Sequence, residues 1–557
     1  MKRTVLVFLI ICSILVDALI GIAEAATGNK DNSGWVSPEN HAATFCRTKA
    51  DNRLRFAVHV TGMGKMDPHF AAGSQDRTVA DMVFNGLLRY VPGNAPAIEP
   101  DLATTMPELS TRDEKQVWTV TLRRGVMFHP SPHLPSYELT AEDVVFSFSK
   151  AVNRSHSAYA GDYDGMTIRK TGQYTVEFIL DRPISSILFF PKITNYNGGF
   201  IVSKKAIEKV GYQAFLKHPV GTGPFLFKSH TPGVSLSLDA HETYFRGKPA
   251  LNEVDLYFVP DTKKRKAGLL SGQYDVIVGS GQKGFADDLL QNPGIEINPH
   301  GPGEVTTIYL NMGIPPFDDI RVRKAVAHAI DRREFLKVYD TSSSGPVFSP
   351  VPANFLPGGL TYKEVQDYGV TYEYNPDKAR TLLAAAGYPD GFKLELVGSE
   401  KRIYRNYYRI LKQQLAKVGI DCTVDILTHS DMHKTIRKNP RSIVIYTAWR
   451  PNADVFLTRF FHSDAILVTG VKPDTNFSNY TSIDSLISSA QVELKPEKQI
   501  SLWQHAQIKI LHDAAAYPVM YATMNTPRKS CVDYGHTLKN SMALYPQFTE
   551  KTNFLHK

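Results

Sequence analysis

The stretch YTAWRPNADVFLTRFF, residues 446–461, sets a tryptophan, two arginines and an aspartate among apolar residues. An indole can form the wall of a ligand pocket, a guanidinium can bind a carboxylate, and a carboxylate can hold an ammonium ion. The same pattern is also that of a buried strand running into a helix. On a strand, Trp449 and Arg450 point to opposite sides, so only one of them need meet a ligand. The stretch predicts either the floor of a ligand pocket or ordinary core packing.

Signals for catalysis are weak in the rest of the chain. The loop GTGPF at residues 221–225 lacks the Lys-Ser/Thr of a phosphate-binding loop, and neither a G-x-S-x-G elbow nor an H-E-x-x-H motif occurs. His129 and His133 are four residues apart, but the prolines between them prevent a regular helix from placing both on one face. Glu142 and Asp143 begin an amphipathic segment, where acidic residues favour a helix N-terminus. The sequence therefore predicts no enzyme, no metal site and no cofactor.

Length and composition describe a folded protein of several domains. A chain of 557 residues is too long for one compact core, so we expect two or three domains. Hydrophobic residues make up 43% and charged residues 21%, which is ordinary for a globular protein. The net charge of +8 is mild for this length, and the basic run KKRK at residues 263–266 has no aromatic residues interleaved with it. We expect a solvated helix face there and no nucleic-acid partner.

The first 25 residues have the pattern of a secretory signal peptide. Lys2 and Arg3 precede an apolar run, and Ala23 and Ala25 place small residues at the positions that a signal peptidase reads. The apolar run is too short to span a bilayer comfortably. We expect cleavage near Ala25 and an exported, periplasmic protein.

Three cysteines follow the predicted cleavage point: Cys46, Cys422 and Cys531. In an oxidising compartment an odd number permits one disulfide and one free thiol. Their spacing matches no zinc motif. We predict a Cys46–Cys531 bridge, which would join the two ends of the mature chain.

Helix and strand signals alternate along the chain. NPDKARTLLAAAG at residues 375–387 has a capping Asn, a Pro in the first turn and a terminal Gly, and residues 318–335 repeat apolar side chains at helical spacing. Short apolar strands are predicted at residues 254–259, 274–279, 306–312 and 392–398. This alternation predicts an α/β architecture.

A series of segments occurs in the order and spacing of one protein family. They include MDPHF (66–70), VFNGLLRY (83–90), WTVTLRRGVMFH (118–129), LTAEDVVFSF (139–148), YFRGKPALNEV (244–254) and YLNMGIPPFDDIRVRKAVAHAIDR (309–332). Through them, nearly all of the chain from about Leu54 onward resembles the family 5 extracytoplasmic solute-binding proteins of ABC importers, of the oligopeptide/dipeptide-binding type.

The resemblance implies a two-lobed periplasmic-binding-protein fold of type II, in the large peptide-binding cluster, with an extra subdomain in the first lobe. After a signal peptide at residues 1–25, we expect the first lobe at 26–87 and 196–303, with the extra subdomain at 88–195 between them. The second lobe is expected at 304–522, and a C-terminal return to the first lobe at 523–557. Two crossing strands would join the lobes, and hinge closure would enclose the ligand.

The resemblance also implies a function. A periplasmic protein of this kind captures di- or oligopeptides, or peptide-like solutes, and delivers them to the permease and ATPase subunits of the importer. It would dock to the membrane permease only peripherally, and we expect a monomer. The alternative is the same fold binding a non-peptide ligand: an opine, a sugar, a metal chelate or haem. A secreted hydrolase is a third hypothesis, but the sequence offers no activated nucleophile for it.

The family pattern gives residues 446–461 a specific interpretation. In the family, a strand ending in Gly/Ala-Trp enters the cleft, and an Asp three residues after that Trp pairs with the α-amino group of the peptide. Here Ala448 and Trp449 match, but Asn452 stands where the Asp is expected. Either a short deletion lets Asp454 reach the amine site, or Asn452 occupies it and the ligand end is not a bare ammonium. A neutral amide can hydrogen-bond an ammonium but cannot offset its charge.

Five further positions belong to the expected ligand site. Arg450 directly follows Trp449, and Arg437 falls where some oligopeptide binders carry a basic residue for the peptide carboxylate. Gly73 and Ser74 follow the DPH motif, where family members line the cleft with backbone groups. Asn311 lies near the expected crossover and could orient either the ligand or the hinge.

Overall fold

The computed structural model describes residues 52–555. The predicted signal peptide and Cys46 lie outside the described residues. Cys531 is disulfide-bonded, and Cys422 is a buried free thiol; the pairing of Cys531 with Cys46 stays a prediction. Every helix within residues 52–555 is too short or too polar to cross a bilayer.

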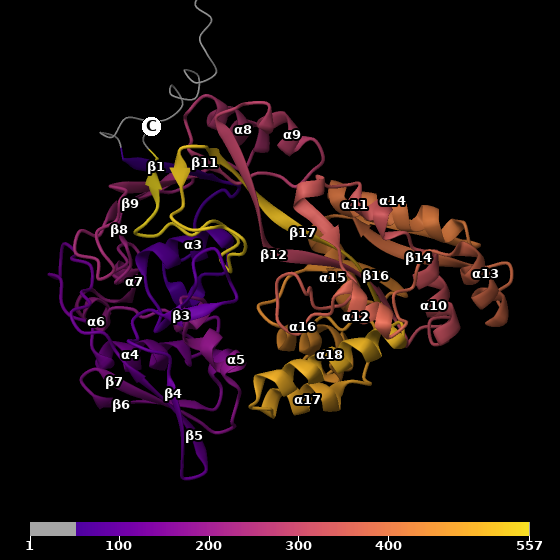
Figure 1. The fold of residues 1–557 in the computed structure, drawn as a ribbon, viewed down its shortest axis with the longest axis horizontal. Coiled ribbons are helices and arrows are strands. Elements are labelled where there is room, and N and C mark those ends of the chain that lie inside the picture. The colour runs from indigo at the N-terminus through magenta and orange to yellow at the C-terminus, as the bar shows by residue number, and fades with distance from the viewer. Residues whose placement is uncertain (1–51, 556–557) are drawn as a thin grey trace, which may run out of the picture. The chain divides into compact units, whose positions relative to one another are not determined.

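The first lobe is built on a sheet whose strands come from distant parts of the chain. β1 (Arg53–Val58) runs parallel to β10 (Glu253–Phe258) on one side and to β11 (Val276–Ile277) on the other. β9 (Ser235–Ala240) and β8 (Phe225–Thr231) continue the sheet antiparallel. The helices α3 (Ser74–Val83), α8 (Thr262–Leu270) and α9 (Phe285–Leu290) complete this part, drawn in indigo to magenta in Figure 1.

The chain segment that runs from β3 (Ile98–Pro100) to β8 forms a separate antiparallel sheet. Its strands are β4 (Glu108–Arg112), β5 (Lys115–Thr121), β6 (Met166–Gly172) and β7 (Thr175–Leu180), in the order β4-β5-β7-β6. α4 (Ala141–Ala151) packs against β6 and β7 and begins with a capping box between Thr140 and Asp143. The acidic start expected for this segment is therefore that of a helix. α5 (Ser186–Phe189) and the short 3-10 helix η3 (Phe190–Ile193) follow the sheet.

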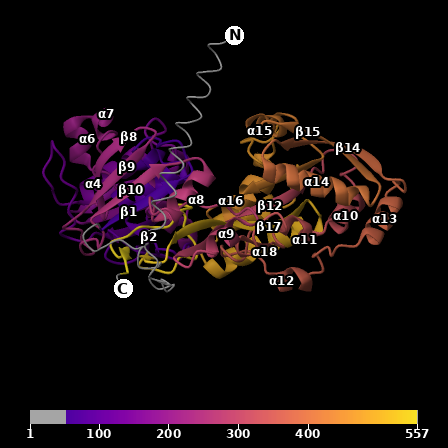
Figure 2. The same cartoon turned by 90° about the horizontal axis from the view of Figure 1, so that it is seen from above.

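Two long strands connect the first lobe to the second. β12 (Ile295–Leu310) and β17 (Ala516–Lys529) pair antiparallel, and their register shifts between His300 and Glu304. β17 continues into the first-lobe sheet through β11, and β12 pairs with β16 (Ile443–Ala448) of the second lobe. One sheet in the order β16-β12-β17-β11-β1-β10-β9-β8 results, in which the two long strands join β16 of the second lobe to the strands of the first (Figures 1 and 2). The predicted boundaries at 303/304 and 522/523 fall inside these two strands and stay predictions.

The second lobe surrounds β12, β16 and β17 with helices. Before β16 come α10 (Ile320–Ala329), α11 (Arg332–Leu336), α13 (Pro376–Ala385) and a parallel pair, β14 (Phe392–Ser399) and β15 (Ile420–Leu427), linked by α14 (Arg402–Ala416). After α15 (His429–Lys438) and β16 come α16 (Ala453–Phe461), α17 (Asp484–Val492) and α18 (Pro496–His512). The helix predicted over residues 318–335 is in fact two, because Ile330 is extended and the Asp331 side chain caps a second start.

Each lobe has its own hydrophobic core. One cluster of buried side chains comes from residues 54–278 together with 531–554, and another from residues 305–522. Two cores of this size allow the lobes to move as separate rigid bodies about the long strands.

Three features noted in the sequence are parts of this scaffold. His129 is buried and its ring Nε2 hydrogen-bonds the Gly223 carbonyl at 2.9 Å. A Cβ atom on Gly221 would collide with the Val83 carbonyl, so the loop at residues 221–225 is a packing element. The expected solvated face of the KKRK run is wrong for Arg265, which is 2% exposed and donates hydrogen bonds to three backbone carbonyls.

Candidate functional site

Residues 446–461 form a strand followed by a helix. β16 pairs with β12 as far as Ala448, opposite Val305, and α16 begins at Ala453. The Oδ1 atom of Asn452 accepts a hydrogen bond from the Val455 backbone N–H at 2.9 Å, so Asn452 is the N-cap of α16. Its amide oxygen is engaged in holding the helix start. Trp449 lies in the short link between the strand and the helix.

Trp449 reaches from the second lobe to the first. Its partly buried indole packs against a small cluster that contains Tyr90, Tyr196 and Met542. The guanidinium of Arg77, on α3, lies 5.7 Å from the centre of the indole ring. The side chain therefore contacts elements that lie far from it in the sequence, which is not how a residue of the second-lobe core behaves.

A cavity of about 330 Å³ lies next to this contact, with walls from both lobes. Tyr196, of the cluster around Trp449, is also part of its wall. The residues that line the cavity include Tyr90, Lys192, Tyr196 and Asn197 from the first lobe, and Asn452 and Asp454 from the second. Apolar side chains of α5 and α16 complete the walls. We call this cavity the interlobe pocket.

Asp454 is the notable charge of the interlobe pocket. Burial raises the pKa of its carboxyl group to about 6, although a hydrogen bond from Gln491 and the charge of Lys192 act in the opposite direction. Its Oδ2 atom accepts that bond at 3.4 Å. Its Oδ1 atom is buried, and within residues 52–555 no group donates a hydrogen bond to it. A buried carboxylate with one oxygen unbonded is expensive unless a donor arrives from outside the chain.

A second acceptor of the same kind lines the pocket from the other lobe. The Oδ1 atom of Asn197 is buried and has no donor among the described residues. Lys192 is the nearby cation: burial lowers its pKa, while Asp162 and Asp454 raise it. Its ammonium group donates to the backbone carbonyl of Asp162. The pocket thus holds two acceptor oxygens, on opposite lobes, that the described side chains leave unused.

Arg450 and Ala448 flank Trp449 but have their own contacts in the second lobe. The Arg450 Nη1 donates to the Trp449 carbonyl at 2.8 Å, and its guanidinium lies 4.7 Å from the centre of the Phe460 ring. Burial lowers its pKa. Ala448 is buried at the end of β16. Neither residue lines the interlobe pocket.

Arg437 belongs to a chain of hydrogen bonds along α15. Its Nη1 donates to His433 Nδ1 at 3.2 Å, and its Nη2 donates to the Tyr446 hydroxyl at 3.1 Å. Because a guanidinium can only donate, His433 must carry its proton on Nε2, which donates to His429 Nε2 at 3.1 Å. His429 then donates from Nδ1 to the Ser399 hydroxyl at 3.1 Å. This proton arrangement leaves no pair of free ring nitrogens for a metal ion, and it commits two nitrogens of Arg437.

The remaining predicted residues lie at backbone turns. Gly73 precedes α3, where a Cβ atom would collide with the Gln75 side chain, and Ser74 is the first residue of that helix. Ser74 lies about one turn before Arg77 on α3, and Gly73 is the N-cap of that helix. Asn311 is buried just after β12, and its Oδ1 accepts from the Gly313 N–H at 3.0 Å. Asn311 and Arg437 line no part of the interlobe pocket.

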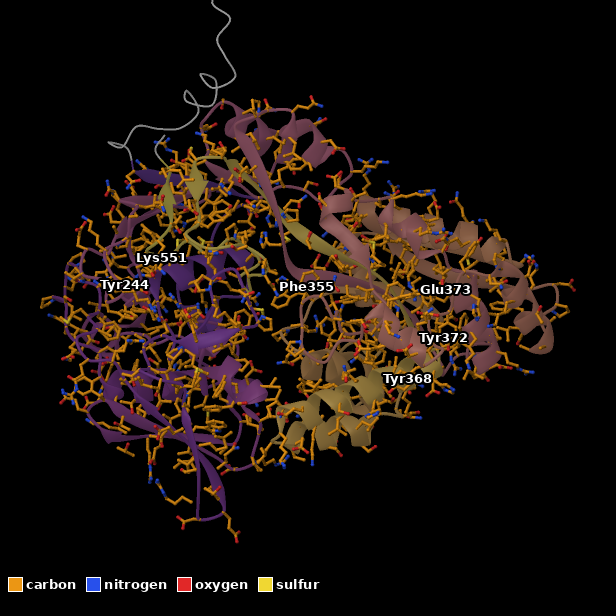
Figure 3. The ribbon with its side chains drawn as sticks, viewed as in Figure 1. Tyr244, Phe355, Tyr368, Tyr372, Glu373 and Lys551 are labelled. Carbon is orange, nitrogen blue, oxygen red and sulfur yellow. The ribbon has the colours of Figure 1, made fainter. Side chains whose placement is uncertain are left out.

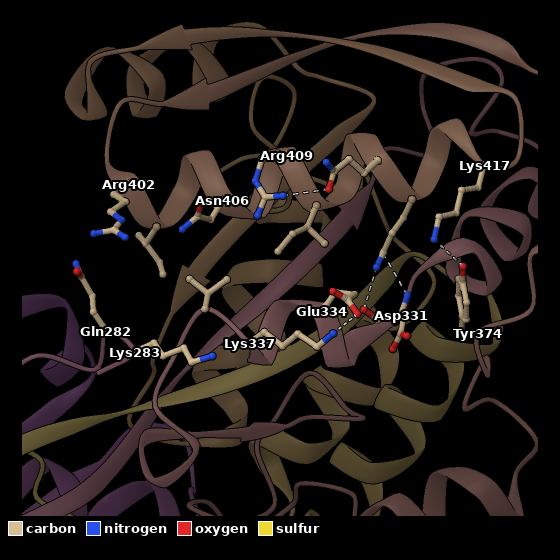
Figure 4. A pocket seen from close by; sticks show the side chains of 15 residues that line it. Gln282, Lys283, Asp331, Glu334, Lys337, Tyr374, Arg402, Asn406, Arg409 and Lys417 are labelled. Carbon is tan, nitrogen blue, oxygen red and sulfur yellow. Dashed lines mark hydrogen bonds and ion pairs between the residues drawn. The ribbon is translucent and has the colours of Figure 1, made fainter. Parts of the chain in front are cut away.

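A larger pocket of about 510 Å³ lies along α14 and α11 (Figure 4). Long charged side chains line it, including Lys283, Arg402 and Arg409, and Lys337 pairs with Glu334 at 2.6 Å. None of the residues expected to bind ligand lies in it. Its polar groups are mostly exposed and already have solvent, so we do not assign it to the solute.

A third pocket, of about 580 Å³, lies where the long strands leave the first lobe. Its walls include Ala95, His300 and Phe355, and Phe355 is labelled between the lobes in Figure 3. Cβ atoms on Gly301 and Gly303 would collide with the Phe355 ring, so the glycines let the ring pack on the backbone of β12. Ala95 also belongs to the cluster around Trp449, so this cluster contributes to the walls of both pockets.

Three of the residues predicted to bind ligand lie next to one another, and their role stays a prediction. Trp449, Asn452 and Asp454 lie together at the first lobe, whereas Arg77, Lys192, Tyr196 and Asn197 were not expected there. Arg77 could have been found, since it follows Gly73 by one helical turn. The other three come from a loop some 250 residues away, and no local pattern marks them. We call the set of Arg77, Tyr196, Asn197, Trp449 and Asp454 the candidate site.

Comparison with known proteins agrees with the fold. The family model for bacterial extracellular solute-binding proteins, family 5, matches residues 97–467. Heme-binding protein A of Haemophilus influenzae is 25% identical over 512 residues, which covers 87% of this chain and 90% of that protein. The dipeptide-binding protein of Escherichia coli is 25% identical over 506 residues, covering 84% and 88%.

Solved structures give the same result. The solute-binding protein MoaA of A. tumefaciens R10, in complex with mannopinic acid, has a TM-score of 0.72 and 33% identity, and the match covers 90% of this chain and 99% of that one. HbpA2 of Haemophilus parasuis has a TM-score of 0.75 at 24% identity, with coverage of 90% and 99%. The two-lobed α/β fold expected from the sequence is confirmed. The chain belongs to the bacterial extracellular solute-binding proteins of family 5.

Proposed function

We propose that the protein captures a small peptide or peptide-like solute between its lobes in the periplasm and delivers it to the permease and ATPase subunits of an ABC importer. One observation supports a ligand with an amino group. The Oδ1 atoms of Asp454 and Asn197 come from opposite lobes, line one pocket, and receive no hydrogen bond from the described part of the chain. An ammonium group carries three donors and a positive charge, so it would satisfy both oxygens and neutralise the carboxylate.

The same arrangement explains how the solute would hold the lobes together. An ammonium ion between Asp454 and Asn197 gains its second partner only when the lobes approach each other. Trp449 also packs on the first lobe, so it too contributes a contact between the lobes. A ligand shifts a conformational equilibrium by as much as its affinity differs between the two states. Contacts to both lobes are therefore the means by which the solute would favour closure.

Between the two residues considered for the amine, Asp454 has the better properties. The side chain of Asn452 caps α16. Moving it away from the helix start to bind a ligand would lower the free energy of unfolding by roughly 1 kcal/mol. Asp454 has an unused oxygen and a carboxyl group that burial makes hard to ionise. An ammonium partner would remove that cost. We therefore assign the amine to Asp454.

An opine is the second candidate ligand. The observation that favours it is the 33% identity with a protein solved in complex with mannopinic acid, which exceeds the identity with the peptide-binding relatives described above. The candidate site alone does not separate the two classes, since it supplies one anion for a nitrogen cation in either case.

The test is a titration of ligand-free protein. The chain is unfolded, freed of co-purified solute, refolded, and titrated by calorimetry with dialanine, trialanine and tetraalanine, and separately with mannopinic acid and haemin. We expect at least one alanine peptide to bind with micromolar or better affinity and to raise the melting temperature. Binding of mannopinic acid or haemin, with no response to any peptide, would overturn the peptide assignment.

A matched pair of variants links the result to the pocket. Asp454→Asn should weaken peptide binding at least about 10-fold, because a buried charge pair loses one partner. Asp421→Asn makes the same change on an exposed part of β15 and should leave the affinity unchanged. Equal affinities for both variants would remove Asp454 from the amine site.

A further inference from the structure

Arg77 places a guanidinium between two aromatic rings from different lobes. It projects from α3, and its Cζ atom lies 5.1 Å from the centre of the Tyr196 ring and 5.7 Å from that of Trp449. Tyr196 is also a wall of the interlobe pocket. Arg77 and the interlobe pocket therefore have Tyr196 as a common neighbour. A cation that contacts two rings is held in place, but the rings do not neutralise its charge.

No protein carboxylate neutralises Arg77 either. Across residues 52–555, Arg77 forms no ion pair, and its Nε atom is buried without a hydrogen-bond acceptor. The adjacent acid, Asp76, accepts hydrogen bonds from the backbone of Gly64 at 2.8 Å and of Gly73 at 3.2 Å, so its oxygens are in use. The interaction that remains is a hydrogen bond with Tyr159. A partly buried guanidinium whose Nε has no acceptor is suited to binding an anion.

The two other arginines expected at the ligand site make their hydrogen bonds within the second lobe, although the Nε atom of Arg450 is also buried without an acceptor among residues 52–555. Arg437 donates to His433 and to the Tyr446 hydroxyl. Arg450 donates to the Trp449 carbonyl and covers Phe460 in the second lobe. Neither is on the first lobe, and neither contacts a residue of the interlobe pocket wall in the way that Arg77 contacts Tyr196.

We infer that Arg77 binds the carboxylate of the solute through its Nε edge, while the amine lies in the interlobe pocket, which Tyr196 also lines. This rests on the proposed function and adds to it a chemical class: a ligand with an amine and a carboxylate, each held close to Tyr196. The geometry favours a bidentate contact, because Nε and one Nη of a guanidinium match the two oxygens of a carboxylate. A lysine at this position would keep the charge but lose the fork.

The test compares a peptide acid with its amide on matched variants. Trialanine and trialanine amide are titrated into wild-type protein, Arg77→Gln, Arg437→Gln and Arg450→Gln. Wild-type protein should bind the acid at least about 30-fold more tightly than the amide, the effect of removing one partner of a buried charge pair. In Arg77→Gln the two affinities should agree within about 3-fold. Arg437→Gln and Arg450→Gln should keep the wild-type ratio.

The outcomes separate this inference from the function on which it rests. Preserved acid preference in folded Arg77→Gln, or its loss in Arg437→Gln instead, would overturn the role of Arg77 while leaving peptide capture intact. If no alanine peptide binds wild-type protein while mannopinic acid or haemin does, peptide capture fails. In that case the carboxylate role of Arg77 is tested on the solute released from native material. The solute is treated with acidic methanol, which converts carboxyl groups to methyl esters. A mass gain from ester formation supports the role of Arg77, and a solute without a carboxyl group refutes it. Circular dichroism and the melting temperature establish that each variant is folded.

Discussion

Asp454→Asn should make the ligand-free protein more stable while making it a poorer binder. Burial raises the pKa of Asp454 from 3.8 to about 6. In the folded state the carboxyl group therefore holds its proton more tightly than in the unfolded state, and stability is lost as the pH rises from about 4 to about 6. Above pH 6 the loss is complete. A difference of two pKa units corresponds to about 3 kcal/mol, and Asn removes most of it, so we expect a gain of about 2 kcal/mol at pH 7.5.

The assay is thermal unfolding of refolded, ligand-free protein at several pH values. At pH 7.5 the melting temperature of Asp454→Asn should exceed that of the wild type by about 2 to 4 °C. The gain should fall to about half near pH 5, where the wild-type carboxyl group is largely protonated in the folded state. Trialanine should stabilise the wild type more than the variant, which reverses their order at saturating peptide.

Asp81 provides a control for this reasoning. Burial raises its pKa to about 6 as well, but both of its oxygens accept hydrogen bonds, from Asn195 and from Gln547. Asp81→Asn would turn an NH₂ group toward a donor, so it should bring no gain in stability. A lower melting temperature of Asp454→Asn at pH 7.5 would refute the destabilising effect of an unbonded buried carboxylate. An increase in melting temperature that is as large at pH 4 as at pH 7.5 would refute it as well.

Three further predictions concern the site and its scaffold. The affinity for trialanine should fall about 10-fold between pH 7.5 and pH 5, as Asp454 takes up a proton, and calorimetry should find a flat pH profile in Asp454→Asn. Trp449→Ala should weaken binding by at least about 10-fold with a nearly unchanged melting temperature of ligand-free protein; a large loss of stability would make Trp449 a core residue. Lys529→Met should lower the free energy of unfolding by about 3 kcal/mol or more, because Lys529 is 2% exposed and pairs with the buried Asp275 at 3.0 Å; unchanged thermal unfolding would contradict this.

Local signals in the sequence were sufficient for much of the fold. The helix at Pro376–Ala385 begins at a capping Asn, and the strand at Phe392–Ser399 begins where the apolar run begins. β12 is longer than predicted, because its first half is polar and belongs to the crossing between the lobes. Such a strand is specified by pairing with β17, more than 200 residues away, which local periodicity does not report.

The candidate site was only partly predictable for the same reason. Asn452 could have been recognised as a helix cap, since it stands before a helical start, but the family pattern suggested a ligand role for it. The importance of Asp454 depends on its burial and its unused oxygen, which are tertiary properties. Arg77 and Asn197 lie far from Trp449 in the chain, and the role proposed for them depends on the meeting of the two lobes.

The most direct test of the account is to identify the solute that the protein carries in its own host. Protein purified without added ligand would be unfolded, and the released small molecules identified by mass spectrometry. The account predicts a peptide or peptide-like molecule with an amine for Asp454 and a carboxylate for Arg77. Recovery of a solute that lacks a basic nitrogen, such as a neutral sugar, would contradict it.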